Sequence, residues 1–246
     1  MKILFASSCL VAFMTTGLAQ TVINERIPFQ NGQAIRMQFD YPELIKISTW
    51  DKNEISIRGE VSINNGENDG AFEITHSLAE NTLNLWGTIK SMKDLPERIT
   101  VIRGGQKVTF RDRNEWQKYK KEHGSTYDVF SVGPEIEITL EIMVPRNVQT
   151  KIESVYGMVE VREFSGPLTV EATYGGVDAT LSEGATGELI AETNYGEIYT
   201  NLDIRFEGDA SEHRDFHTLV SATPGSGPRY SFGSKYGNVY LRKAAN

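Results

Sequence analysis

Four tyrosines recur at fixed places in the second half of the chain, and their type and spacing suit ligand binding. The four steps are Tyr156-Gly157, Tyr174-Gly175, Tyr195-Gly196 and Tyr236-Gly237. They follow a period of about 20 residues, which is the sequence mark of a repeat architecture. The last interval spans two periods, so one phrase is missing near Asp215 to Val220. An exposed row of such rings would be a platform for sugar rings, which makes these four tyrosines the candidate binding residues.

The alternation of side chains favours the opposite orientation for the same tyrosines. Each tyrosine follows a small residue by two positions, as Tyr156 follows Ser154, and it shares that parity with the apolar positions. Alternation of this kind points the rings inward, where they would form an internal aromatic stack. A bulge at the glycine would rotate the rings outward instead. Both orientations remain open.

Catalytic motifs are not found in the sequence. It contains no nucleophile elbow, zinc-binding His-Glu-x-x-His, phosphate loop or dinucleotide fingerprint. His213 and His217 could hold a metal on a helix, but the residues between them indicate a surface loop. The acidic residues of the repeats alternate along the strands, which favours a solvated face over a Ca²⁺ site or paired catalytic carboxylates. Those residues are Glu160, Glu171, Asp178, Glu192 and Glu197. We expect no enzyme activity, no metal and no cofactor.

Short alternating strands must position these residues. From Val22 to Ile89, apolar residues alternate with polar ones between turn signals such as Asn31-Gly32. From Ile136 onward, strands joined at glycine corners would form the coils of a solenoid. The predicted fold is all-β: parallel β-solenoid or β-helix-like repeats (133–246) that follow an N-terminal β-sheet region (22–90).

The segment 91–132 interrupts the strands and is predicted to be a hairpin and a short helix. The hairpin turns at Gly104-Gly105, and the helix runs from a capping Asn114 to Gly124. Trp116 and Tyr119 share one face of this locally basic helix, which makes them candidate partner-contact residues. The alternative is a solvated insertion that packs on the sheet.

Residues 1–19 resemble a signal peptide. Lys2 supplies the positive charge, Ile3 to Met14 the apolar run, and Gly17-Leu18-Ala19 the small residues of a cleavage site. The run is shorter than the roughly 18 residues that a membrane anchor requires. Cys9 is the one cysteine, so residues 20–246, expected to form a single domain, would have no disulfide. A net charge of −8 disfavours nucleic acid and anionic membranes as partners.

One resemblance to a known family follows from the strand that precedes the repeats. Glu137-Ile-Thr-Leu-Glu-Ile-Met-Val-Pro145, followed by strand-Gly-Val/Ile steps, resembles the putative-adhesin family of bacterial envelope proteins, a family of unknown function. It is also similar to the β-solenoid head domains of autotransporter adhesins. The resemblance implies a parallel β-helix or solenoid over about Ile27 to Leu241, apart from the insertion. The family usually has a small residue before the glycine, where this chain has tyrosine.

These observations favour a non-enzymatic, exported protein that presents a solenoid surface for adhesion or binding. Its compartment would be the periplasm, the outer surface or the extracellular space. Its partner would be an envelope polysaccharide or another envelope protein, with no membrane span in the mature chain. The alternatives are a polysaccharide-active enzyme on a β-helix and an envelope scaffold or sensor that binds another protein.

Overall fold

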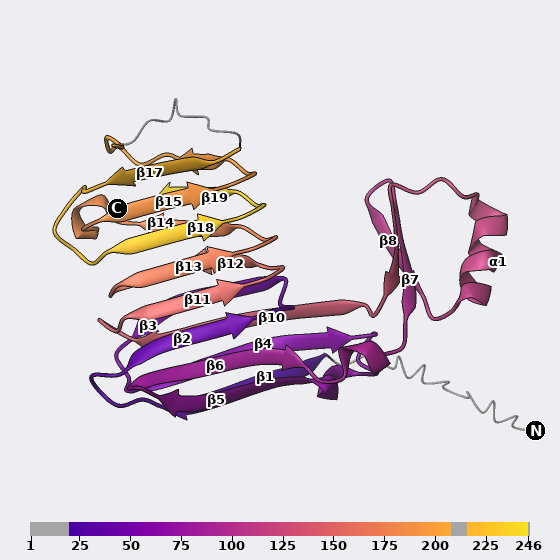
Figure 1. Ribbon diagram of the computed structural model, residues 1–246. Coiled ribbons are helices and arrows are strands. Elements are labelled where there is room, and N and C mark those ends of the chain that lie inside the picture. The colour runs from indigo at the N-terminus through magenta and orange to yellow at the C-terminus, as the bar shows by residue number, and fades with distance from the viewer. Residues whose placement is uncertain (1–19, 208–215, 246) are drawn as a thin grey trace, which may run out of the picture.

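The computed structural model describes residues 20–207 and 216–245, so the predicted signal peptide and His213 lie outside the described residues. Within that part of the chain, two eight-stranded sheets face each other across one apolar core, and a smaller three-stranded sheet carries the single α-helix (Figure 1). The prediction of an all-β chain with one short helix is confirmed. Both large sheets are mixed: the second has parallel pairs in the middle and antiparallel pairs at both edges, whereas the first is antiparallel at the β1 edge and parallel at the β16 edge.

The strands of the two large sheets are as follows. In spatial order, the first sheet contains β1 (Thr21–Pro28), β4 (Glu54–Ile63), β10 (Ile136–Pro145), β3 (Leu44–Trp50), β12 (Met158–Val161), β14 (Val177–Leu181), β19 (Val239–Lys243) and β16 (Ile198–Thr200). The second contains β17 (Thr218–Ala222), β15 (Leu189–Thr193), β18 (Tyr230–Ser234), β13 (Leu168–Ala172), β11 (Thr150–Ser154), β2 (Ala34–Phe39), β6 (Thr82–Ile89) and β5 (Phe72–Ala79).

The core between the sheets comes from the alternation that the sequence predicts. In β2, Ile35, Met37 and Phe39 are buried, and in β3 Ile45 and Ile47 are buried. Full burial of an aliphatic or aromatic side chain contributes about 1.5–3 kcal/mol each. The same pattern continues in the short repeat strands, whose inward positions form one continuous cluster with those of the N-terminal strands.

The repeats form coils that have one strand in each sheet. β11 leads into β12, β13 into β14, β15 into β16 and β18 into β19, each time through a corner that contains the Tyr-Gly step. Equivalent strands pair in parallel and in register in both sheets. The coils do not stack in chain order, because β18 lies between β13 and β15 and β19 lies between β14 and β16. The last two coils therefore stand in the stack in the reverse of their order in the chain.

Antiparallel strands close the edges of the stack. β1 and β5 cover one end, and β17 pairs with β15 at the other. β17 includes the end of the segment in which a repeat phrase is missing. This part of the chain therefore forms an antiparallel edge strand, and not another coil. Beside it, Leu202, Ile204 and Phe206 pack partly buried against the core and cover its end.

Residues 98–133 project from the stack as a separate unit, which we call the arm (Figure 1). It contains β7 (Arg98–Arg103), β8 (Gln106–Phe110), α1 (Arg113–His123) and β9 (Val129–Gly133). The hairpin and the helix were predicted, whereas β9 was not. Trp116 and Tyr119 of α1 pack on a small core of Ile99, Val101 and Phe110. The helix thus packs on the three-stranded sheet of the arm itself. The alternative of a solvated insertion had it packing on the sheet of the repeats.

The start of α1 also differs from the prediction. The N-cap is Asp112, whose side chain accepts hydrogen bonds from the backbone N–H groups of Asn114 and Glu115. Asn114 was expected to cap the helix but lies inside it. Gly124 ends the helix, as predicted, at a positive φ of 83° that glycine adopts without strain.

The connection between arm and stack is partly ionic. Lys107 of β8 lies 2.9 Å from Glu135 and 2.6 Å from Glu137 at the start of β10. Burial lowers the pKa of Lys107, but the hydrogen bonds to these two carboxylates outweigh it, so the pKa is raised.

Three short 3-10 turns complete the described structure: η1 (Asp69–Ala71), η2 (Met92–Asp94) and η3 (Glu183–Ala185). None of the described helices is both long and apolar enough to cross a membrane.

Candidate functional site

The glycine of each Tyr-Gly step allows neighbouring corners to lie in direct backbone contact. A Cβ on Gly175 would lie 1.9 Å from the carbonyl oxygen of Gly157, and a Cβ on Gly237 would lie 2.0 Å from that of Gly175. The same holds for Gly196 against Gly237, at 2.0 Å. None of these glycines has a positive φ, so the residue type is required by space and not by the dihedral angle. Any side chain here would push the coils apart.

Buried hydroxyls beneath the corners join one coil to the next. Ser234 donates to the carbonyl of Gly175 at 2.7 Å and accepts from the N–H of Gly237 at 2.9 Å. Thr193 makes the equivalent pair, to the carbonyl of Gly237 at 2.9 Å and from the N–H of Gly196 at 3.0 Å. Ala172 occupies this position in the second coil and has no hydroxyl. At Ser154, Thr193 and Ser234, the small residue two positions before the tyrosine is therefore a corner hydrogen-bonding site.

The tyrosines project outward from the corners and stack on one another. In spatial order, Tyr156 and Tyr174 have ring centroids 5.3 Å apart, Tyr174 and Tyr236 are 5.1 Å apart, and Tyr236 and Tyr195 are 5.1 Å apart. The angles between ring planes are 6–12°. The exposed fractions are 57% for Tyr156 and Tyr174, 58% for Tyr195 and 43% for Tyr236. The structure therefore brings all four predicted residues together in one exposed row.

The parity argument for inward tyrosines is wrong, because it counts the tyrosine as part of the strand. Each strand ends two residues earlier, and Val155-Tyr156-Gly157 forms a bend between β11 and β12. Alternation applies only while the backbone is extended. The bend at the close-packed glycine turns the ring to the outside, as the alternative allowed.

Two further rings extend the row beyond the four predicted ones. Tyr41 stacks on Tyr156 at 6.2 Å, and Phe216 stacks on Tyr195 at 5.7 Å. Tyr41 belongs to an additional coil, β2 to β3, whose corner reads Tyr41-Pro42 in place of Tyr-Gly. An alignment that allowed proline after the tyrosine would have found it. We call the set Tyr41, Tyr156, Tyr174, Tyr236, Tyr195 and Phe216 the aromatic ladder.

The charged surroundings of the ladder are mostly paired. Burial, helped by Asp40 and Tyr156, raises the pKa of Tyr41. On the outer face of the second sheet, Glu153 lies 3.0 Å from Arg36 and 2.9 Å from Lys151, which also pairs with Glu171. Burial raises the pKa of Glu153, but hydrogen bonds from Lys151 and Arg36 outweigh it and lower the pKa.

The acidic residues of the repeats are largely engaged in ion pairs. Besides Glu171, Asp178 pairs with Arg242 at 2.7 Å and Glu160 with Arg162 at 3.3 Å, and Glu192 lies within hydrogen-bond distance of His217 at 2.8 Å. Within residues 20–207 and 216–245, no three His, Cys, Asp or Glu side chains gather in a way that could hold a metal ion. The arrangement matches a charged solvated face.

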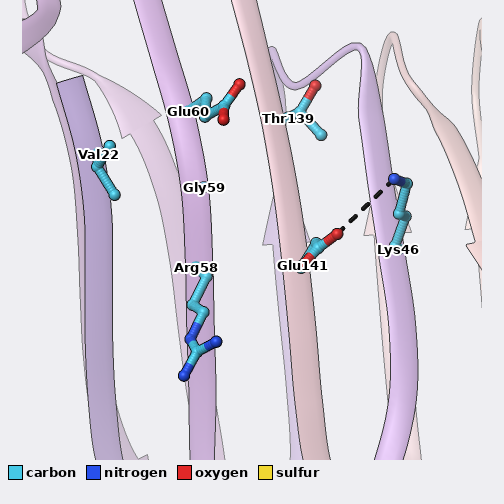
Figure 2. Close-up of a pocket in the computed structure, with 7 residues that line it drawn as sticks. All are labelled: Val22, Lys46, Arg58, Gly59, Glu60, Thr139 and Glu141. Atoms are coloured by element: carbon cyan, nitrogen blue, oxygen red, sulfur yellow. Dashed lines mark ion pairs between the residues drawn. The ribbon is translucent and has the colours of Figure 1, made fainter. Parts of the chain in front are cut away.

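A shallow hollow of about 270 Å³ lies on the outer face of the first sheet (Figure 2). Gly59 of β4 forms part of its lining, and side chains of both signs surround it. Lys46 of β3 and Glu141 of β10 form an ion pair at 3.7 Å, and Arg58 of β4 is the cross-strand neighbour of Glu141. Because opposite charges alternate across the strands, the hollow has no net preference for either anionic or cationic ligands.

The predicted contact residues of the arm are less exposed than expected. The Trp116 ring packs against Phe130 at 5.5 Å, and the Tyr119 ring packs against Phe110 at 5.0 Å. The exposed apolar residues lie instead on β9, where Val129, Phe130 and Val132 are 46%, 49% and 52% exposed. A hollow of about 370 Å³ adjoins them, lined by Glu97, Ile99, Arg111, Asp112, Arg113, Trp116, Phe130 and Val132.

Comparisons with known proteins give only distant likenesses. The chain is similar in structure to a putative cell adhesion protein from Clostridium sporogenes, with 9% identity, a TM-score of 0.46, and coverage of 92% of this chain and 100% of that one. It is also similar to a putative adhesin from Bacteroides fragilis, with 11% identity, a TM-score of 0.21, and coverage of 92% and 99%. No family model and no curated protein matches the sequence. The names agree with the resemblance to adhesins, but likenesses this distant carry no argument about function.

Proposed function

We propose that the chain is a non-enzymatic, exported binding protein whose β-solenoid side presents the aromatic ladder for adhesion. The observation that carries the proposal is the row of exposed, stacked tyrosines, each in the same place on its coil. Large apolar rings are usually buried, and a contiguous exposed row of them is typical of interaction surfaces. Five corner-joined strand pairs stacked in parallel support the solenoid description.

The position of the rings supports binding more than a purely structural role. Stacked aromatic pairs contribute about 0.5–1.5 kcal/mol each beyond area burial. Phenylalanine would provide the same stacking, and a phenol hydroxyl is needed only where it finds a partner. Since the four tyrosines remain 43–58% exposed, about half of their surface is available to a ligand.

The proposed export rests on the sequence of residues 1–19, with its basic start, apolar run and small residues before Gln20. The net charge of −8 favours solubility in such a compartment. A non-enzymatic role, against the rival of a polysaccharide-active enzyme, is supported by the pairing of the acidic side chains. Carboxylates held in ion pairs are poor candidates for a pair that cleaves glycosidic bonds.

A second candidate function, contact with a partner protein, is favoured by the arm. β9 lies at the edge of a three-stranded sheet and contains neither a charged residue nor proline. Edge strands are usually protected by such residues, because an unprotected edge pairs with other chains. Together with the exposed Phe130 and Val132, β9 would suit a scaffold or sensor that binds another envelope protein, with Trp116 and Tyr119 supporting the surface from beneath.

The test of the ladder compares two double variants that each remove two stacked tyrosines. Tyr174→Ala with Tyr195→Ala removes both neighbours of Tyr236. The control is Tyr199→Ala with Tyr240→Ala, a stacked pair on the first sheet with ring centroids 5.2 Å apart. Retention on envelope polysaccharide and the thermal midpoint are measured for both. The proposal expects the ladder variant alone to lose retention at temperatures at which both variants are folded. Equal retention of both variants would refute it.

A further inference from the structure

The rings of the aromatic ladder cover one another's faces. Centroid distances of 5.1–5.3 Å with nearly parallel planes leave no room for a ligand ring between neighbouring tyrosines. The exposed part of each residue is therefore the ring edge with its hydroxyl. Within the described residues, none of the hydroxyls of Tyr156, Tyr174, Tyr195 and Tyr236 has a hydrogen-bond partner, whereas the Tyr230 hydroxyl donates to the Phe164 carbonyl at 2.8 Å. The ladder thus presents a line of hydroxyl groups and not a flat stacking platform.

The spacing of these hydroxyls is set by the backbone. Parallel strands hold neighbouring coils about 4.7–4.9 Å apart, and backbone contact at the glycine corners prevents adjustment. An extended peptide repeats one face about every 6.6–6.8 Å, so it would fall out of step within two or three residues. One pyranose in an extended, equatorially linked glycan has nearly the length of one ladder step. Such a glycan can place one sugar opposite each tyrosine over the whole row, with alternate sugars turned over so that opposite edges of neighbouring sugars face the hydroxyls.

The charges near the ladder favour a neutral glycan over an acidic one. The chain carries a net charge of −8, and Asp40 and Glu43 flank Tyr41 at one end of the row. Burial raises the pKa of Glu43, with smaller contributions from Glu137 and Glu135 and opposition from Lys107. Lys235, whose amine lies 5.2 Å from the Tyr236 ring centroid, is a basic residue beside the row. An acidic polysaccharide would be repelled at the Tyr41 end of the row.

From this geometry we infer that the ladder binds a neutral, extended, equatorially linked glycan of the cellulose or chitin type. The chain lies along the ladder, with one sugar per tyrosine hydroxyl. The inference rests on the proposed function and adds the class of ligand. Phe216 has no hydroxyl, so the five tyrosines define the length of the site, and affinity should rise with glycan length and level off near about five sugars.

The experiment measures binding of three hexasaccharides by calorimetry. Cellohexaose and maltohexaose contain the same glucose units, but the axial linkage of maltohexaose coils the chain and breaks the match with the ladder. Chitohexaose tests tolerance of the amino sugar. The variant is Tyr174→Phe with Tyr236→Phe, which removes two central hydroxyls and retains the stack. The control is Tyr199→Phe with Tyr240→Phe.

We expect wild type to bind cellohexaose or chitohexaose at least tenfold more tightly than maltohexaose. The ladder variant should lose roughly ten- to thirtyfold in affinity and the control should lose none. Equal affinity for cellohexaose and maltohexaose would overturn the inference. So would the absence of binding to any hexasaccharide at millimolar concentration. If wild type then still showed ladder-dependent retention on envelope material, the proposed function would stand without this ligand. The absence of both hexasaccharide binding and ladder-dependent retention would overturn the inference and the proposed function together.

Discussion

Replacement of Gly175 by alanine tests whether close backbone contact at the corners holds the coils together. The new Cβ would lie 1.9 Å from the carbonyl oxygen of Gly157 and 2.4 Å from its carbonyl carbon. Ordinary van der Waals contact begins at about 3.4 Å, so these atoms must separate by more than an ångström. Both are backbone atoms in a corner that is paired on each side, and they cannot move as a flexible side chain would.

The expected destabilisation follows from two opposing terms. Alanine in place of glycine stabilises by about 0.4–1 kcal/mol when the site tolerates it, because the unfolded chain loses conformational freedom. Overpacking costs typically about 1–3 kcal/mol and more where the backbone must shift. The displacement also strains the stacking of Tyr156 on Tyr174 and the Ser234 hydrogen bond to the Gly175 carbonyl. We expect a net loss of about 3 kcal/mol, which corresponds to roughly 6–12 °C in the thermal midpoint for a chain of this size.

The assay is reversible chemical unfolding followed by circular dichroism, and the control is Gly184→Ala. A Cβ on Gly184 meets no atom within 4 Å, and Gly184 does not have a positive φ. The control should be unchanged or more stable by up to about 1 kcal/mol. If Gly175→Ala proved as stable as Gly184→Ala, the close approach of the corners would not be what requires glycine after each tyrosine, and the reasoning would fail.

Three further predictions concern the corners, the ion pairs and the arm. Ala172→Ser should stabilise the fold by about 1 kcal/mol in urea unfolding, because the new hydroxyl can donate to the Gly157 carbonyl and accept from the Gly175 N–H. Ser234 makes the equivalent two hydrogen bonds one coil away, and a loss of stability would contradict the prediction. Glu153→Gln should lower the thermal midpoint near pH 7 by an amount equivalent to at most about 1 kcal/mol. Since the folded-state pKa of Glu153 is lowered, its pairs stabilise above its usual pKa of 4.5, and the two midpoints should converge as the pH falls below it; a constant difference down to pH 3 would exclude this. Asp112→Ala should destabilise α1 by about 1 kcal/mol and speed proteolysis of the arm, while the thermal midpoint of the stack stays unchanged. A proteolysis rate equal to that of wild type would show that the cap is dispensable.

Much of the architecture could be predicted from local patterns. Alternation placed Ile35, Met37 and Phe39 in the core correctly, because a strand between two layers must turn every second side chain toward the other sheet. The Tyr-Gly period located four coils, because each coil meets the same steric requirement at its corner. The hairpin and helix of the arm were also evident from their turn and capping residues, although the cap was assigned to Asn114 and not to Asp112.

The properties of the site itself depend on contacts between distant parts of the chain. The sequence alone determines that tyrosine recurs once per coil, since that is a local repeat. Only the tertiary structure decides that the rings face outward, because the bend at a close-packed glycine ends the alternation. It also decides that Tyr236 lies between Tyr174 and Tyr195 and that Tyr41 joins the row, because strand pairing depends on contacts between segments far apart in the sequence. The spacing of the tyrosines along the sequence gives the period of the repeat. The order of the rings in the ladder depends on strand pairing between distant segments, which no local pattern determines.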